Sequence, residues 1–131
     1  MRTFAVMKTK GQLEAEISTA IIKFEKEYMG RGPDETKSYI IDDMIFIRLR
    51  NVLTPAEKQL AMAHDFSDGK ALIKQVRMQL LEKARGLLED LVQDITGQKV
   101  TSLHTDISTV TGERVIIFAL AGSPDCRDAP D

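Results

Sequence analysis

Two short groups of residues in this sequence have types and spacings that could do chemistry. The first is His104 and Asp106 in LHTDIS, because residues two apart on a strand project from the same face. Such a pair can bind a metal ion or exchange a proton. It also fits a polar strand face that forms hydrogen bonds across a sheet. The second interpretation is favoured, since no His or Cys cluster with zinc-ligand spacing accompanies the pair. We therefore expect no metal site and assign no catalytic residue.

The second group is Gly30-Arg31-Gly32-Pro33, the most unusual local sequence in the chain. Two glycines let a backbone approach a ligand or partner closely, and an arginine can hold a phosphate or carboxylate. The alternative is a helix C-cap followed by a rigid turn. The nucleotide motifs GxxxxGK[ST] and GxGxxG are absent, and we expect no cofactor. The candidate residues for binding a ligand or partner are Gly30, Arg31, Gly32, Pro33, His104 and Asp106.

Other polar residues are explained without a site. Asp42-Asp43 has the composition of a turn, and Cys126 lies in a polar tail with no neighbouring base.

Six basic residues in the middle of the chain suggest a nucleic-acid face. However, aromatic residues make up only 5% of the chain, so bases would find few stacking partners and a solvated face is favoured. These basic residues are Arg48, Arg50, Lys58, Lys70, Lys74 and Arg77.

The elements that position these residues begin with a helix. Apolar residues recur at spacings of three and four from Lys10 to Met29, which predicts one amphipathic helix. Its charged residues, including Glu25, are expected on the other faces. Gly30 can supply the left-handed residue that ends it. Two β-branched stretches then flank a turn, which predicts a hairpin with strands at 37–42 and 44–50.

The second half of the chain repeats this order. Thr54-Pro55-Ala56-Glu57 has the composition of a capping box and predicts a short helix to about His64. A long helix over 70–96 follows, with a wide apolar stripe, and at about 1.5 Å per residue it should overhang a small sheet or meet a second subunit. Strands are predicted at 100–109 and 114–120, and RVIIFAL should be central because it is the most apolar of the strands.

These elements predict an α+β fold. Two helix–hairpin units form one four-stranded antiparallel sheet with the helices on one face, plus one short helix. In the first hairpin, Phe46 shares the outer face with two arginines, which suggests cover by a partner or by another part of the fold. Residues 9–120 are expected to form a single domain, with 1–8 a flexible arm and 121–131 a flexible tail.

Length and composition narrow the class of protein. The 131 residues suit one domain, and a net charge of −2 argues against a nucleic-acid protein that binds through bulk charge. No apolar run approaches the roughly 20 residues of a membrane span. The single cysteine and the lack of a signal-peptide pattern at the N-terminus predict a cytoplasmic protein.

Four segments resemble a bacterial family, the MpsC-like domain of a sodium-translocating, membrane-potential-generating system. They are KTKGQLEAEIS, KFEKEYMGRGPDETKSYIIDDMIFIRL, LTPAEKQLA and ITGQKVTSLHTDISTVTGERVIIFAL, and they cover about residues 8–120. The resemblance implies association with a membrane system linked to membrane potential and inorganic-carbon uptake. It supplies no catalytic residues. The matched residues include the loop 30–33, the start 54–57 and the strand 104–108.

Three functions follow from these observations. The first is a non-enzymatic accessory or regulatory subunit that acts by protein–protein interaction. It would form a dimer or other homo-oligomer, or bind a membrane transport protein at the inner face of the membrane. The second is a domain that senses a small molecule or anion through the glycine loop. The third is a nucleic-acid-binding module, to which the loop is a poor match because a hairpin follows it.

Overall fold

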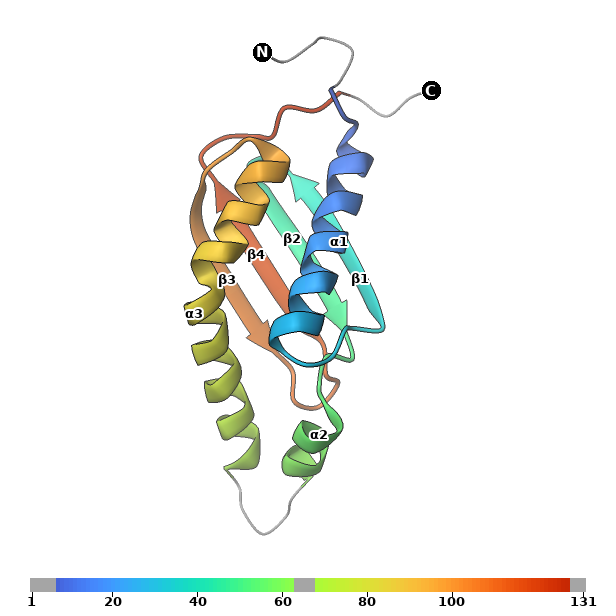
Figure 1. Ribbon diagram of the computed structural model, residues 1–131, viewed down its shortest axis with the longest axis vertical. Helices are drawn as coiled ribbons and strands as arrows, with labels where there is room; N and C mark the ends of the chain where they lie inside the picture. Colours follow the sequence, from blue (N-terminus) through green and yellow to red (C-terminus); the bar gives the residue numbers. More distant parts are fainter. Residues whose placement is uncertain (1–6, 63–67, 128–131) are drawn as a thin grey trace.

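The computed structural model describes residues 7–62 and 68–127. In chain order its elements are the helix α1 and strands β1 and β2, the short helix α2, the long helix α3, and strands β3 and β4 (Figure 1). Their bounds are α1 Lys10–Tyr28, β1 Glu35–Ile41, β2 Met44–Arg50, α2 Pro55–Met62, α3 Gly69–Thr96, β3 Val100–Ile107 and β4 Arg114–Leu120. The predicted α+β fold of two helix–hairpin units and one short helix is confirmed.

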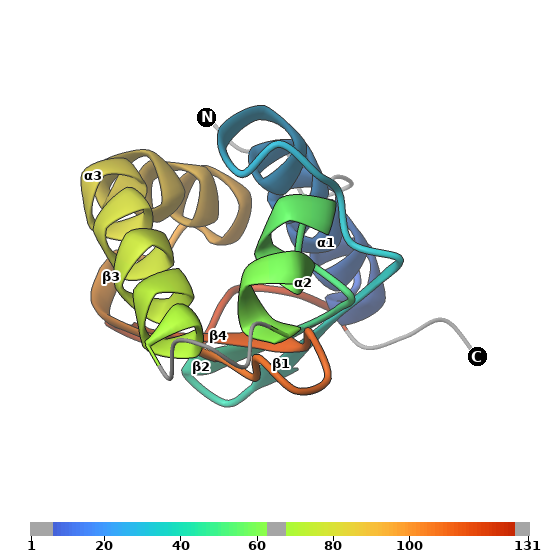
Figure 2. The ribbon, with the colours of Figure 1, turned by 90° about the horizontal axis from the view of Figure 1, so that it is seen from below.

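The four strands form one antiparallel sheet in the order β1-β2-β4-β3. The second strands of the two hairpins lie side by side in the middle, and β4 is central as its apolar sequence predicts. All three helices lie on one side of the sheet and none covers the other side (Figure 2). The sheet therefore has an inner face beneath the helices and an outer face that no described element covers.

Local sequence explains where most elements begin and end. Thr9 and Gln12 form a capping box at the start of α1, and Thr54 and Glu57 exchange the same pair of hydrogen bonds at the start of α2. Gly97, with φ of 74°, ends α3 in the left-handed conformation that glycine tolerates. Small differences from the prediction occur at the ends: β1 begins two residues earlier, and β3 ends at Ile107 rather than at 109. The predicted end of α2 near His64 lies outside the described residues.

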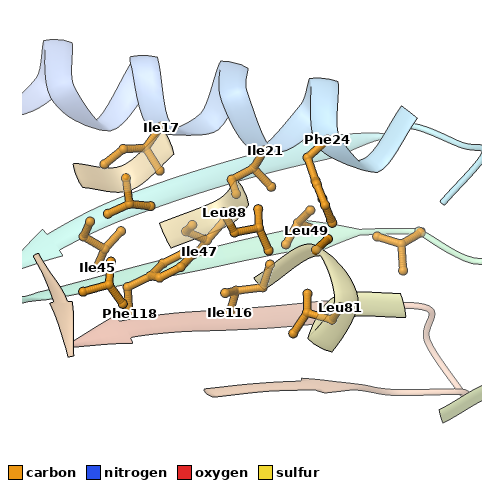
Figure 3. Packing of buried hydrophobic residues seen from close by; sticks show 14 of the residues in the cluster. Ile17, Ile21, Phe24, Ile45, Ile47, Leu49, Leu81, Leu88, Ile116 and Phe118 are labelled. Carbon is orange, nitrogen blue, oxygen red and sulfur yellow. The ribbon is translucent and has the colours of Figure 1, made fainter. Parts of the chain in front are cut away.

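The core lies between the helices and the inner face of the sheet. Alternate residues of β2 and β4 point inward and are buried, while α1 and α3 each contribute one row at helical spacing (Figure 3). The labelled residues of this core are Ile17, Ile21, Phe24, Ile45, Ile47, Leu49, Leu81, Leu88, Ile116 and Phe118.

Helix α3 is longer than the sheet that it covers. Its 28 residues span about 42 Å at 1.5 Å per residue, whereas seven-residue strands span about 24 Å. The first turns of α3 extend past the sheet and lie beside α2, as Figure 1 shows. The overhang expected from the sequence is present. However, the wide apolar stripe of α3 is only partly covered, because the sheet and α1 reach only one side of it.

The ends of the described chain lie against each other. The backbone N–H of Arg127 donates to the carbonyl oxygen of Lys8 at 3.0 Å, and its Nε donates to the carbonyl of Met7. Thr9 and Arg127 form an isolated parallel bridge. Arg127, which the sequence assigns to the tail, thus contacts the residues just before α1.

Candidate functional site

The glycine loop is held by contacts within the chain. Gly30 has φ of 82° and ends α1, as predicted, and a Cβ at Gly32 would lie 2.8 Å from the side chain of Lys26. Arg31 donates to the Asp34 carboxylate at 2.8 Å and to the backbone carbonyl oxygen of Asn51 at 3.2 Å. The positive φ gives Gly30 a structural reason, and the guanidinium of Arg31 fastens the loop to the end of β2. Pro33 lies half-buried in the same loop.

His104 and Asp106 share the outer face of β3, as their spacing predicts. Both are exposed, with His104 paired in register with Ile117 and Asp106 with Val115. The Asp106 carboxylate accepts from the backbone N–H of Ile107 at 2.8 Å and pairs with Lys74 at 3.3 Å. The Ile107 hydrogen bond is the main cause that lowers the pKa of Asp106. His104 and Asp106 do not form one site with the glycine loop. The loop leads into β1, and β1 and β3 are the opposite edges of the sheet.

A buried cluster of four charged residues joins all three helices to the sheet, and sequence reasoning missed it. Arg77 of α3 donates through Nε and Nη2 to the Glu57 carboxylate at 2.8 and 2.7 Å, and through Nη2 to the carbonyl of Val52 at 2.9 Å. Glu25 of α1 lies 3.8 Å from Nη1 of Arg77 and 3.6 Å from Nη1 of Arg114 on β4. Two positive and two negative charges balance in this cluster.

The structure corrects two expectations here. Glu25, expected on an outer face of its helix, is 0% exposed, and Arg77, expected on a solvated basic face, is 2% exposed. The burial of both residues could be predicted from their helical spacing relative to the apolar residues. Glu25 follows Ile17 and Ile21 at intervals of four, and Arg77 lies four residues from both Ile73 and Leu81. Charged residues in phase with an apolar row indicate a buried ion cluster.

The pKa values of the two glutamates in the cluster shift in opposite directions. Burial raises the pKa of Glu25 and outweighs the attraction of Arg114 and Arg77. Neither oxygen of Glu25 accepts a hydrogen bond from any described residue. Burial also acts on Glu57, but its hydrogen bonds from Arg77 and from the Thr54 backbone lower its pKa overall. Glu57 is therefore hydrogen-bonded to Arg77, whereas Glu25 interacts with the two arginines only through longer ion pairs.

An apolar groove lies where α2 meets the overhanging part of α3. We call it the helix groove; its volume is about 210 Å³ and its lining is almost entirely apolar. Farther along α3, Leu80 and Leu87 are 40% and 41% exposed and extend the same side of the helix. Arg77 links this region to the core, since it binds both Glu57 of α2 and the segment before α2. The lining residues are Ala56, Glu57, Leu60, Leu72, Ile73 and Val76.

The uncovered outer face of the sheet is also rich in apolar side chains. Alternation in β2 and β4 places the residues between the core positions on this face. In a half-solvated antiparallel sheet these positions are usually polar. The apolar residues of the outer face are Tyr39, Ile41, Met44, Phe46, Val115, Ile117 and Ala119.

Comparisons with known proteins place this fold in a family. The family model described as Na⁺-translocating membrane potential-generating system (MpsC) matches residues 9–122. A Bacillus subtilis (strain 168) protein named uncharacterized protein YbcI is 45% identical over 113 residues, which cover 86% of this chain and 89% of that protein. No solved structure matches the chain. Among the described residues, no helix combines the length and apolar character needed to cross a membrane. The family match spans most of the chain, and the chain therefore belongs to the MpsC family.

Proposed function

We propose that this chain is a non-enzymatic accessory or regulatory subunit of a membrane-potential-generating system, and that it acts by binding a transport protein of that system. The proposed place of action is the cytoplasmic side of the membrane. Membership of the MpsC family supports the choice of this membrane system. The helix groove supplies the single structural observation that supports binding, because it is concave and apolar and no described residue fills it.

The groove fits one kind of partner element, an amphipathic helix. Leu72, Val76 and Leu80 follow one another at intervals of four on α3, and each is at least 40% exposed. A helix that presents apolar residues at spacings of three and four can lay them along such a row. Leu60 of α2, 37% exposed, forms the opposite wall. The ligand in this proposal is thus a helical segment at the cytoplasmic side of the transport protein.

Capture from native membranes tests the proposal. The tagged chain is incubated with mild-detergent extracts, and captured proteins are identified by mass spectrometry. We expect a subunit of an ion-translocating membrane system, and Leu72→Lys should reduce its recovery at least about tenfold, because a buried unpaired charge in a hot spot costs well over 1.4 kcal/mol. The captured subunit is then purified and its binding to the chain is measured directly.

Met78→Lys is the matched control. Met78 lies on the same helix and is 61% exposed, but it is not a lining residue of the groove. This variant should capture the subunit as well as the wild-type chain does. The proposal is rejected if Leu72→Lys captures the subunit normally, or if the wild-type chain recovers no component of an ion-translocating system.

A further inference from the structure

The central strand β4 has a sequence suited to burial on both faces, yet only its inner face is covered. Ile116, Phe118 and Leu120 point into the core, while Val115 and Ile117 point to the outer face. Strands that are apolar on both sides are found where both sides are buried. No described residue covers the outer face of this sheet, so its apolar side chains are open to a partner.

The open face has an apolar half and a charged half. Ile41, Met44 and Ala119 form one row across the sheet, and the next row contains Tyr39 and Phe46 together with Ile117 and His104. Ile41, Tyr39 and Met44 are 58%, 43% and 41% exposed. These two rows cover one end of the sheet and are almost free of charge.

The charges at the other end are already paired within the chain. Arg48 pairs with Glu113 at 2.7 Å, and Glu35 pairs with Lys37 at 3.3 Å and with Arg50 at 3.8 Å. A partner for this face consequently needs no complementary charged patch. It needs an apolar surface that is flat on the scale of a sheet.

Each edge of the sheet has one outward backbone N–H that a side chain already occupies. On β1, Glu14 of α1 accepts a hydrogen bond from the backbone N–H of Ile40 at 2.8 Å, and on β3 the Asp106 side chain accepts from the N–H of Ile107. A register shift between Val100 and Ser102 further disrupts the β3 edge. These features weaken the edges as sites for strand addition and leave the apolar face as the better site for a second chain.

We propose that the occupant of the outer face is a second copy of this chain, packed face to face about a two-fold axis. Two-fold packing places the same patch on both sides, so the apolar rows meet each other and the internally paired charges lie at the rim. Four strands about 4.8 Å apart and seven residues long give each sheet about 440 Å², so two copies bury on the order of 1,000 Å² with their side-chain relief. That area is at the lower limit for a specific dimer, and we expect a micromolar dissociation constant.

This dimer does not depend on the partner proposed for the helix groove, because the groove lies on the opposite side of the sheet from the outer face. The two proposals can therefore fail separately.

Sedimentation velocity over about 1–200 µM protein, a range that brackets the affinities of small interfaces, tests the proposal. We expect the wild-type chain to shift from monomer to dimer. Ile41→Lys, at an exposed end of β1, should raise the dissociation constant at least about tenfold, because it places an unpaired charge in the apolar half of the interface. Val110→Lys, at an 82% exposed position in the turn between β3 and β4, is the matched control and should dimerise normally.

A labelling experiment locates the interface independently of mutant stability. In a Cys126→Ser background, the thiol of the Tyr39→Cys variant should react with a maleimide more slowly as protein concentration rises. The thiol of the Val110→Cys variant should react at a constant rate. Leu72→Lys should leave the dimer intact. The inference is overturned by a wild-type chain that stays monomeric, by dimers that Ile41→Lys leaves unchanged, or by equal labelling of both cysteines at all concentrations.

Discussion

Arg77→Met should destabilise this protein far more than Glu25→Gln, although both residues belong to the same buried cluster. Arg77 donates three hydrogen bonds, two to the Glu57 carboxylate and one to the carbonyl of Val52, and its side chain is 3% exposed. Methionine fills similar space but leaves both carboxylates without their shared cation. Removal of one partner from a buried ion pair costs about 3–5 kcal/mol, so we expect a loss of that size.

Glu25→Gln should cost much less because the Glu25 carboxylate is poorly compensated in the folded protein. Its oxygens lie 3.8 and 3.6 Å from the two guanidinium groups, too far for good hydrogen bonds. Burial raises the pKa of Glu25 despite both arginines, so the site already favours the neutral form more than water does. Glutamine has nearly the same shape and no charge, and we expect a loss below about 1.5 kcal/mol.

Urea unfolding followed by circular dichroism measures both losses. A domain of this size is stable by about 5–15 kcal/mol, so a loss of 3–5 kcal/mol moves the midpoint clearly. Arg77→Lys serves as the control for charge alone and should fall between the two variants, because lysine keeps the charge but cannot form the two-pronged contact with Glu57. The reasoning is refuted if the Arg77→Met and Glu25→Gln losses agree within about 1 kcal/mol.

Three further predictions concern glycine, pH and capping. Gly69→Ala should destabilise the protein by about 1–3 kcal/mol, because the new Cβ would lie 2.3 Å from the backbone oxygen of Leu60. Gly86→Ala has open space around the new Cβ and should stabilise the protein by up to about 1 kcal/mol. Thermal melts compare the two variants. The stability contributed by Glu25 should fall as pH rises from its ordinary pKa of 4.5 through its raised value, and urea titrations should find this slope missing in Glu25→Gln. Thr54→Ala should cost about 1 kcal/mol in urea unfolding through loss of the α2 capping box, and an unchanged midpoint would contradict that role.

The sequence alone predicts the local elements of this protein well, because their signals are short-range. The spacing of apolar residues identifies both long helices, and the capping box at Thr54 and the left-handed Gly97 mark where α2 begins and α3 ends. Alternation in the strands also predicts that Ile45 and its in-phase neighbours face the core, as they do. Each of these signals depends on a few neighbouring residues whose geometry is the same in any fold.

Only the tertiary structure decides what covers each face of those elements. The apolar stripe of α3 includes Leu80 and Leu81 alike, but the sheet and α1 reach only one side of the helix, so Leu81 is buried and Leu80 is exposed. The strand order that places β2 beside β4 likewise creates an outer face whose apolar surface the helices never reach. The contacts of Arg31 with Asp34 and Asn51 also depend on how the loop meets the end of β2.

The buried cluster shows the same division. Helical phase alone places Glu25 and Arg77 in line with buried residues, but phase does not say that Arg114 arrives from the sheet or that Glu57 arrives from α2. A charge is stable in a core only when an opposite charge from a distant part of the chain meets it. The sequence by itself determined the helices, hairpins and family of this protein. The pairing of its buried charges and the surfaces left open to partners were decided by the packing of segments far apart in the chain.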